Sequence, residues 1–355
     1  MSTAKPQPGR ILLIRTDRIG DVILSTPVAV ALKKAFPQCR ITFLVRRATL
    51  PVVENCPAVD DAVAIETWMR NGRLRLRALV DFLKRNEFDT AVHLFPRPAI
   101  ALAAFLARIP RRIGTGYRYY SMLFNHRIYE HRKTAQRHEA EYNLQLLTPL
   151  GIEAPEVAFA LTVPEAAEQN IEQWLEKTGV HADEPLVVLH PGSGGSARDW
   201  PPEHFAELAQ RLAVEEKVRI VFTGGPHEQE LVDAIMKRMT VKPLHLVGRL
   251  TLQELAALLR RADVFVANST GPLHLAVALG TEVVAFYPPI LACRPERWGP
   301  YGRRDDVLMS QQEECFRCRK SALRWCECMY RIPVQAALDK IIEKLTKKYP
   351  ERPKK

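Results

Sequence analysis

Long hydrophobic runs are missing from this chain of 355 residues. The longest, Pro98–Ala107, spans ten residues between Arg97 and Arg108, whereas a helix that crosses a bilayer needs about 20. The first ten residues also lack the apolar stretch of a secretion signal. We therefore expect a cytoplasmic protein without transmembrane helices.

Repeats, low-complexity tracts and long flexible linkers are also absent from the sequence. The composition is 47% hydrophobic and 26% charged, with 17 Gly and 26 Pro. These values are ordinary for a folded protein and exclude collagen-like, coiled-coil and disordered classes. At about 150 residues per domain, the length predicts two domains, each with a buried core.

Acidic residues are scarce in the first half of the chain. Residues 1–150 hold 24 Lys and Arg against 12 Asp and Glu, whereas residues 151–355 hold 27 against 28. The positive charge is densest over residues 97–137, which carry nine Lys and Arg and a single acid, Glu130. Such a field attracts nucleic acid, anionic lipid or another polyanion. A surface kept soluble by its charge is the alternative.

Short β-rich runs alternate with longer amphipathic segments, which is typical of parallel α/β sheets. In the first half we expect one helix over 21–36, an irregular basic stretch after 106 and a helix over 138–147. The pattern restarts at 186 after a helix over 164–177. The strands that we expect are 11–14, 41–45, 62–65, 90–94, 186–189, 218–222, 244–247 and 264–267, and the other helices are 74–85, 99–106, 202–214, one that ends at Met239, and 252–260.

This pattern predicts an α/β fold with two Rossmann-like, doubly wound domains that face each other across a cleft. The first domain comprises residues 1–163 and the second residues 164–332. The remaining residues, 333–355, form a helix and tail. Apolar residues line one face of that helix, so it must dock back on another part of the protein.

Four strand-to-helix junctions could carry chemistry, because open α/β sheets bind ligands at the carboxyl ends of their strands. In the first, Arg15–Asp21, Gly20 permits a tight turn and Asp21 begins the next helix. Asp21 fits two roles, a helix cap or a general base for a substrate in the cleft. If Asp21 is only a cap, His93 near the end of its strand is the first alternative base.

The second junction, His190–Trp200, is rich in glycine and serine. Its backbone N–H groups and the helix N-terminus that follows suit a phosphate group, and Arg198 could add a bidentate contact to the same anion. No Gly-Lys-Ser/Thr sequence closes the loop, so it is not a P-loop.

The third junction, Thr223–Glu230, offers Glu228 or Glu230 to ribose hydroxyls, although an acid in a first helical turn also complements the helix dipole. The fourth, Ala267–His274, opens a helix with hydroxyl side chains and places His274 in the first turn. Two helix N-termini that suit anions in the same half of the chain would fit a pyrophosphate.

In this order, the four junctions resemble those of glycosyltransferase family 9, and the resemblance covers nearly the whole chain. The family contains the ADP-heptose:lipopolysaccharide heptosyltransferases. The resemblance implies a GT-B fold, an inverting transfer, a nucleotide-sugar donor on the C-terminal domain and an acceptor on the N-terminal one. The segments that carry it are Ile14–Val22 with Pro27, His190–Ser193 with Trp200 and Pro201, Phe222–Gly225, and Ser269–His274.

The resemblance also implies roles for single residues. Asp21 matches the general base, Arg198 a basic donor-binding position and Glu228 an acid that faces the nucleoside. At Ser269 the chain departs from the family pattern, because many heptosyltransferases have Asp there, and this position bears on donor identity. The residues that match the two phosphate loops are Ser193, Gly194, Ser269, Thr270, Gly271 and His274.

The charge of the first half agrees with an acceptor of this kind, since lipopolysaccharide core precursors are acidic and lie at a membrane face. We predict that the first domain binds the acidic core acceptor, with a peripheral contact to the inner face of the inner membrane and no nucleic acid. The acceptor-binding residues that we expect are Arg18, Arg97, Arg111, Arg112 and Arg118.

Seven cysteines are present, four of them clustered as Cys315, Cys318, Cys326 and Cys328. In the cytoplasm, structural disulfides are uncommon. The cluster offers four thiolates to zinc, but its Cys-x-Cys half differs from the usual spacing, and reduced thiols in a loop are the alternative.

The sequence therefore predicts an inverting glycosyltransferase that moves a heptose from ADP-heptose to the lipopolysaccharide inner core. The donor is a substrate, and the scheme requires no cofactor or metal. Alternatives are a family member with another sugar nucleotide or acceptor, a GT-B sugar-nucleotide epimerase or hydrolase, and a non-catalytic module that binds polyanions through the basic stretch.

Overall fold

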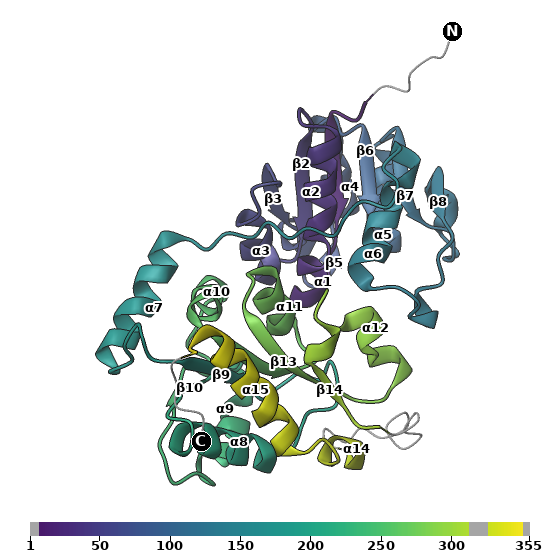
Figure 1. Cartoon of the computed structure of the whole chain (residues 1–355). Helices are drawn as coiled ribbons and strands as arrows, with labels where there is room; N and C mark the ends of the chain where they lie inside the picture. Colours follow the sequence, from purple (N-terminus) through teal and green to yellow (C-terminus); the bar gives the residue numbers. More distant parts are fainter. Residues whose placement is uncertain (1–6, 312–325, 351–355) are drawn as a thin grey trace. The chain divides into compact units, whose positions relative to one another are not determined.

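The computed structural model describes residues 7–311 and 326–350, and within them the chain forms two compact units (Figure 1). The first unit runs to Arg132 and adds Glu139–Thr162. The second takes the short segment Lys133–His138 and resumes at Val163. Each unit has its own parallel sheet, in agreement with the predicted pair of Rossmann-like folds.

Six parallel strands form the sheet of the first unit, in the order β3-β2-β1-β6-β7-β8. The order reverses between β1 and β6, so the loops that follow these two strands open at the same point of the sheet. A separate antiparallel pair, β4 and β5, forms a hairpin. The strands are β1 (Arg10–Ile14), β2 (Arg40–Val45), β3 (Asp61–Ala64), β4 (Met69–Arg70), β5 (Arg73–Leu74), β6 (Thr90–His93), β7 (Arg111–Thr115) and β8 (His126–Ile128).

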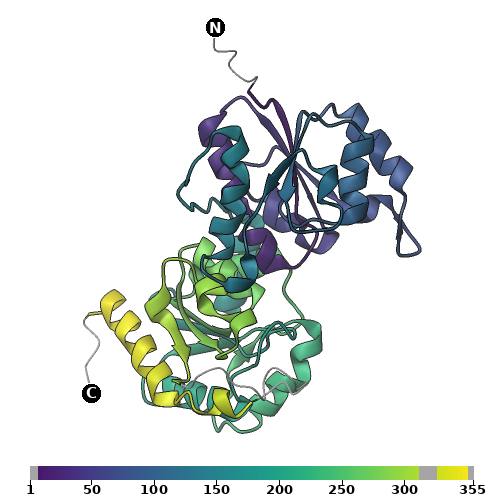
Figure 2. The same cartoon turned by 90° about the vertical axis from the view of Figure 1, so that its right-hand side faces the viewer.

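Helices cover both faces of this sheet (Figure 2). α4 and α5 contact each other and pack Leu79, Leu83 and Ile100 against the strands, whereas α2 and α6 form a second contacting pair. The helices are α1 (Ile19–Ile23), α2 (Thr26–Ala35), α3 (Leu50–Glu54), α4 (Leu76–Arg85), α5 (Pro98–Leu106) and α6 (Glu139–Leu144), and a 3₁₀ turn, η3, spans Ser121–Leu123.

The second unit repeats the same topology, with six parallel strands in the order β11-β10-β9-β12-β13-β14. Here the order reverses between β9 and β12. The strands are β9 (Leu186–His190), β10 (Arg219–Phe222), β11 (Leu244–His245), β12 (Val264–Asn268), β13 (Glu282–Tyr287) and β14 (Val307–Met309), and the helices are α7 (Glu165–Lys177), α8 (Pro202–Val214), α9 (Gln229–Met236), α10 (Leu252–Arg261), α11 (Gly271–Ala278), α12 (Pro295–Trp298), α14 (Glu327–Tyr330) and α15 (Val334–Lys348).

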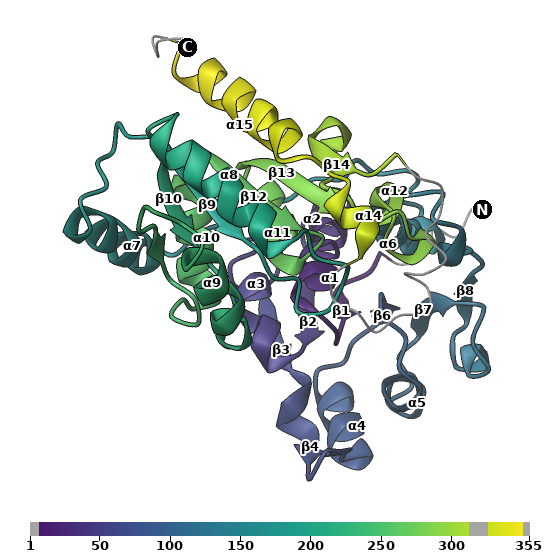
Figure 3. The same ribbon diagram turned by 90° about the horizontal axis from the view of Figure 1, so that it is seen from below.

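The predicted C-terminal helix, α15, docks on the second unit beside α8 (Figure 3). Ala337, Leu338 and Ile341 are buried in the same apolar cluster as residues of β9, β12 and β13. The apolar stripe read from the sequence is therefore the face that packs on the sheet.

The predicted helix over residues 21–36 is in fact two helices, α1 and α2. Pro27 has no N–H to donate to the carbonyl of Ile23, and the Thr26 hydroxyl donates to that carbonyl instead, at 2.8 Å. The Ser25 hydroxyl donates to the carbonyl of Asp21, also at 2.8 Å. These side-chain bonds satisfy carbonyls at the end of α1 and allow the chain to turn before α2 begins.

Six strands of the structure were not predicted: the short strands of the β4–β5 hairpin and four strands of the two parallel sheets. β7 and β8 lie in the basic stretch, where arginines and Gly114 hide the short β pattern, and they complete one side of the first sheet. β13 carries a Val-Val-Ala-Phe-Tyr run typical of a buried strand, so its signal was present in the sequence. β14, only three residues long, pairs with β13 at the sheet edge.

Candidate active site

In the first unit, the loop after β1 gathers carboxylates around one buried arginine. Arg15, 2% exposed, donates from Nε to Asp17 Oδ1 at 2.9 Å and from Nη2 to Asp21 Oδ1. Its Nη1 donates to Glu139 Oε1 and to the carbonyl of Leu94, both at 3.2 Å. Since Leu94 follows β6, this arginine ties together the two loops that open at the reversal of strand order.

Asp21 does not act as a helix cap. The N-cap of α1 is Arg18, whose side chain makes no capping bond, and Asp21 lies in the first turn. The carboxylate of Asp21 receives the Arg15 guanidinium, and 17% of its side chain remains exposed. The arginine thus orients a carboxylate that still reaches solvent, which is the arrangement that a general base needs.

A second arginine, Arg132, bonds to residues of the cluster around Arg15. Arg132 Nη1 donates to Glu139 Oε1 at 2.6 Å and to Asn143 Oδ1 at 3.1 Å. Burial lowers the pKa of Arg15, but attraction to Asp17, Glu139 and Asp21 outweighs that effect, so the pKa is raised overall. Burial raises the pKa of Asp17 to about 6, against the opposing attraction of Arg15.

His93, the alternative base, is the last residue of β6 and is only 1% exposed. Burial, with a smaller contribution from Arg112, lowers its pKa to about 3. Neither ring nitrogen has a hydrogen-bond partner among the described residues. A buried neutral imidazole that packs on Phe124 is poorly placed to take a proton from an acceptor hydroxyl.

In the second unit, the structure joins the two predicted phosphate loops. They follow β9 and β12, the neighbouring strands at which the sheet order reverses. The buried Asn268 side chain donates to the carbonyl of Pro191 at 2.6 Å and accepts from the N–H of Trp200 at 2.8 Å. Ser196 adds a third link by donating to the carbonyl of Ser269 at 2.9 Å. The two loops therefore form one connected structure.

Glu228 organises the glycine-rich loop. Its Oε1 accepts from the N–H of Gly194 at 3.2 Å and its Oε2 accepts from the N–H of Gly225 at 2.8 Å. A Cβ on Gly192 would lie 1.7 Å from Glu228 Oε1, so only glycine fits there. Gly194 has φ +55°, a left-handed conformation that glycine adopts without strain. Glu228 thus holds the loop backbone directly.

Two buried histidines flank these loops. His274 in the first turn of α11 is 5% exposed, and its Nδ1 has no partner within the described residues. Burial, and then the nearby His138, lower its pKa to about 3. His190 pairs through Nδ1 with the Thr223 hydroxyl at 3.0 Å, and burial lowers its pKa against the opposing effect of Glu228. An unsatisfied buried nitrogen in a native structure is unusual, and this one stands in the first turn of a helix that follows a predicted phosphate loop.

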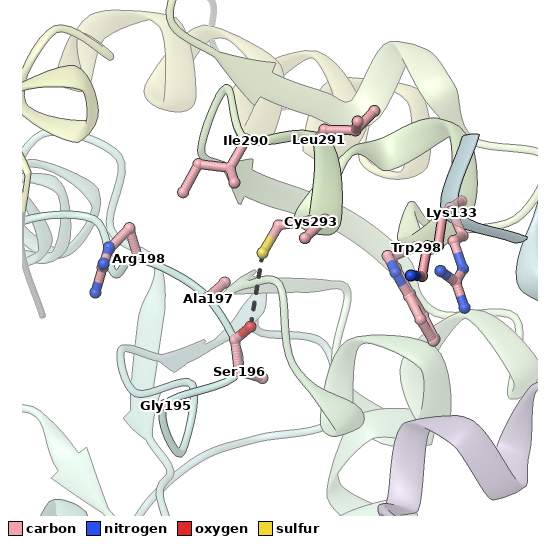
Figure 4. Close-up of a pocket in the computed structure, with 11 residues that line it drawn as sticks. Lys133, Gly195, Ser196, Ala197, Arg198, Ile290, Leu291, Cys293 and Trp298 are labelled. Atoms are coloured by element: carbon pink, nitrogen blue, oxygen red, sulfur yellow. Dashed lines mark hydrogen bonds between the residues drawn. The ribbon is translucent and has the colours of Figure 1, made fainter. Parts of the chain in front are cut away.

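A cavity of about 550 Å³ opens beside the glycine-rich loop (Figure 4). One wall comes from the loop and the other from the segment after β13, and the two walls touch where the Cys293 thiol lies 3.8 Å from the carbonyl of Ser196. This volume suits a small-molecule site. The lining residues are Lys133, Gly195–Arg198, Ile290–Cys293, Arg297 and Trp298.

Comparisons with known proteins identify the family of this chain. The family model described as glycosyltransferase family 9 (heptosyltransferase) matches residues 76–325. The chain belongs to glycosyltransferase family 9. It is 26% identical to lipopolysaccharide heptosyltransferase 3 of Escherichia coli over 76% of this chain and 80% of that protein.

Solved structures of glycosyltransferase family 9 share the fold. A Veillonella parvula member superposes with a TM-score of 0.81 at 23% identity, covering 96% of this chain and 98% of that one. The E. coli ADP-heptose lipopolysaccharide heptosyltransferase II gives 0.77 at 22% identity, covering 96% and 99%. The predicted family, its GT-B fold and the assignment of this chain as a glycosyltransferase are confirmed.

The predicted acceptor arginines of this family member lie in different environments. Arg18, Arg97 and Arg118 are exposed, and Arg97 stacks 5.0 Å from the Phe95 ring. Arg111 contacts Asp89 at 3.4 Å. Arg112 donates to the carbonyls of Ile109 and Leu123, which holds its guanidinium within its own unit. Acceptor binding by these five arginines stays a prediction. The three exposed ones are better placed for it, because their side chains reach solvent.

The sequence did not reveal which side chains hold Asp21 in place. Arg15 and Asp17 stand within the first motif, but the local sequence does not show which residues pair with Arg15. Glu139 and Asn143 come from α6, more than a hundred residues away. The available signal was a basic residue directly after a fully apolar strand, where a charge requires a partner.

The structure describes two of the four clustered cysteines, Cys326 and Cys328. Cys315 and Cys318 lie outside the described residues. Cys328 is buried in the core of the second unit, and Cys326 packs against it. Over residues 7–311 and 326–350, no group of His, Cys, Asp and Glu side chains has the arrangement of a metal site. In the same residues, no helix is both long and apolar enough to span a bilayer.

Proposed function

We propose that this enzyme transfers a heptose from ADP-heptose to an acidic lipopolysaccharide inner-core acceptor with inversion at the anomeric carbon. The first unit would bind the acceptor at the inner face of the inner membrane, and the second would bind the nucleotide-sugar. Support comes from the family, whose related E. coli enzymes act on lipopolysaccharide and in one case carry ADP-heptose in their name.

Asp21 is the general base of this proposal. Its carboxylate takes the proton of the acceptor hydroxyl while the hydroxyl oxygen attacks the anomeric carbon. The bond between that carbon and the diphosphate oxygen breaks, and its electron pair leaves with ADP. Arg15 is a positioning residue, because it holds Asp21 while its own side chain is buried.

The second unit stabilises the charge that develops on the leaving diphosphate. Donors come from the N-terminus of α11 and from N–H groups of the glycine-rich loop other than that of Gly194, which donates to Glu228, and Arg198 adds a positive charge. Ser193, Thr270 and Gly271 belong to the same two loops. Glu228, which holds the loop, would also face the nucleoside.

The observation that carries the proposal is the unpartnered Nδ1 of His274. A buried imidazole nitrogen without a partner costs free energy unless a ligand satisfies it. It lies where the two loops, tied by Asn268 and Ser196, meet the start of α11. A diphosphate at this point would supply the missing partner and would be surrounded by donors.

The test is product formation from a panel of sugar nucleotides and truncated core acceptors, read by mass spectrometry. We expect a product one heptose heavier with ADP-heptose, and none with UDP-hexoses. Transfer from a UDP-hexose alone would refute the donor. Epimerised or hydrolysed sugar nucleotide without acceptor product would favour the epimerase or hydrolase alternative.

A further inference from the structure

The first unit exposes a group of apolar side chains that its core does not use. Tyr119 is 82% exposed, Met122 73%, Phe105 45% and Leu106 43%. Phe105 and Leu106 end α5, whereas Tyr119 and Met122 belong to the connection between β7 and β8. These four side chains define what we term the α5–η3 surface.

Packing beneath this surface holds the two segments together. Tyr120 and Phe124 are buried against Ala101 of α5, with Leu123 beside them. The Tyr120 hydroxyl donates to the carbonyl of Pro96 at 2.7 Å, before α5 begins. With residues 120, 123 and 124 packed inward, Tyr119 before them and Met122 among them are left at the surface.

An arginine links the two segments a second time. Arg112 lies 5.4 Å from the Phe105 ring and donates to the carbonyl of Leu123 at 2.8 Å. Arg112 therefore contacts both Phe105 of α5 and Leu123, the residue that follows Met122 in η3. Figure 3 shows α5, β7 and β8 side by side. The four apolar side chains belong to one local region of the unit.

Positive charge borders the same region. Arg108, Arg118 and Arg127 are exposed, and Arg127 donates to the carbonyl of Phe124 at 3.1 Å, inside the connection that carries Tyr119 and Met122. Exposed apolar and aromatic groups bordered by arginine suit the interface of an anionic bilayer, where apolar side chains enter the headgroup layer and cations meet lipid phosphates. Leu106 and Met122 favour lipid over nucleic acid, whose bases stack on aromatic rings but offer aliphatic chains little.

We propose that the α5–η3 surface docks this enzyme on an anionic lipid bilayer. Tyr119, Met122, Phe105 and Leu106 insert at the level of the headgroups, and the bordering arginines bind lipid phosphates. This inference names the surface and the lipid charge for the membrane contact in the proposed function. It needs neither a donor nor an acceptor, so it stands or fails apart from the transfer reaction.

The experiment is co-flotation of the full chain with vesicles of phosphatidylcholine alone or with about one-third phosphatidylglycerol. We expect binding to the anionic vesicles only, and loss of binding when NaCl rises from about 0.1 M to about 1 M. Tyr119→Ser with Met122→Ser should lower the partition coefficient at least about fivefold. Met69→Ser, at an exposed methionine of β4, should leave it unchanged.

The charge is tested by a second pair of variants. Arg108→Gln with Arg127→Gln should weaken binding by about 25-fold, since each arginine near an anionic surface contributes about fivefold. Arg70→Gln with Arg73→Gln removes the same charge from the β4–β5 hairpin and should have little effect. Thermal melting checks that each variant is folded.

Two results would overturn the proposal. One is equal binding of wild type and the Tyr119/Met122 variant to anionic vesicles. The other is no flotation together with tight, salt-sensitive binding of a single-stranded oligonucleotide, which would assign the region to nucleic acid.

Discussion

At the scale of single residues, the sharpest prediction concerns Asp21. Asp21→Asn keeps the size of the side chain and can still accept from Arg15, but it cannot take a proton. A positioned base contributes about 10²–10⁴-fold in rate, so we expect turnover to fall at least about a hundredfold. Melting temperature and ADP affinity should stay close to wild type. Steady-state kinetics, thermal melting and calorimetry measure the three quantities.

Asp17→Asn is the matched control, because it removes a carboxylate from the same arginine without touching Asp21. Turnover of this variant should remain within a few-fold of wild type. If both variants lose activity equally, the charge of the whole Arg15 cluster is what matters, and Asp21 has no separate role as base.

At the scale of elements, the loop after β9 depends on Gly192. Gly192→Ala would place a Cβ 1.7 Å from Glu228 Oε1 and push the carboxylate off the Gly194 and Gly225 N–H groups. Each of these hydrogen bonds to a charged group contributes about 1.5–3 kcal/mol to the stability of the loop. Without them the loop is no longer held in its binding conformation, so we expect donor affinity to fall about tenfold or more. Titration calorimetry with ADP measures this loss.

Gly225→Ala tests the same carboxylate without the clash, since its Cβ would lie 3.8 Å from Glu228 Oε2, an ordinary contact. Donor affinity of this variant should stay within a few-fold of wild type. Unchanged ADP affinity in folded Gly192→Ala would mean that the loop does not bind the diphosphate.

At the scale of the whole molecule, the asymmetry of charge predicts where the acidic acceptor binds. Arg97→Gln with Arg118→Gln should raise the acceptor KM and flatten its dependence on salt, because the lost attraction is the part that salt screens. A soluble truncated acceptor keeps lipid out of the assay. Donor KM should not change.

The control removes equal charge elsewhere in the first unit, by Arg75→Gln with Arg77→Gln, both exposed at the start of α4. This pair should leave the acceptor KM near wild type. A fall in donor affinity in the Arg97/Arg118 variant would contradict the assignment of the acceptor to the first unit.

The sequence alone was enough for the fold class and for the main motifs. Hydrophobic periodicity reports local structure, so β9, α8 and α15 appeared within a residue or two of their bounds. Residues at strand ends were expected near one another because parallel strands end at one edge of the sheet. The links made by Asn268 and Ser196 agree with this expectation.

Only the tertiary structure decided how those residues are held. Arg15 meets Glu139 across 124 positions of sequence, and a contact over that distance leaves no local pattern. The division of α1 from α2 depended on the hydroxyls of Thr26 and Ser25, which bond the Ile23 carbonyl left without a donor by Pro27 and the carbonyl of Asp21. The sequence determined which groups stand at each strand end, because chemistry and periodicity are local. Packing determined which of them are buried together, because burial requires partners from distant parts of the chain.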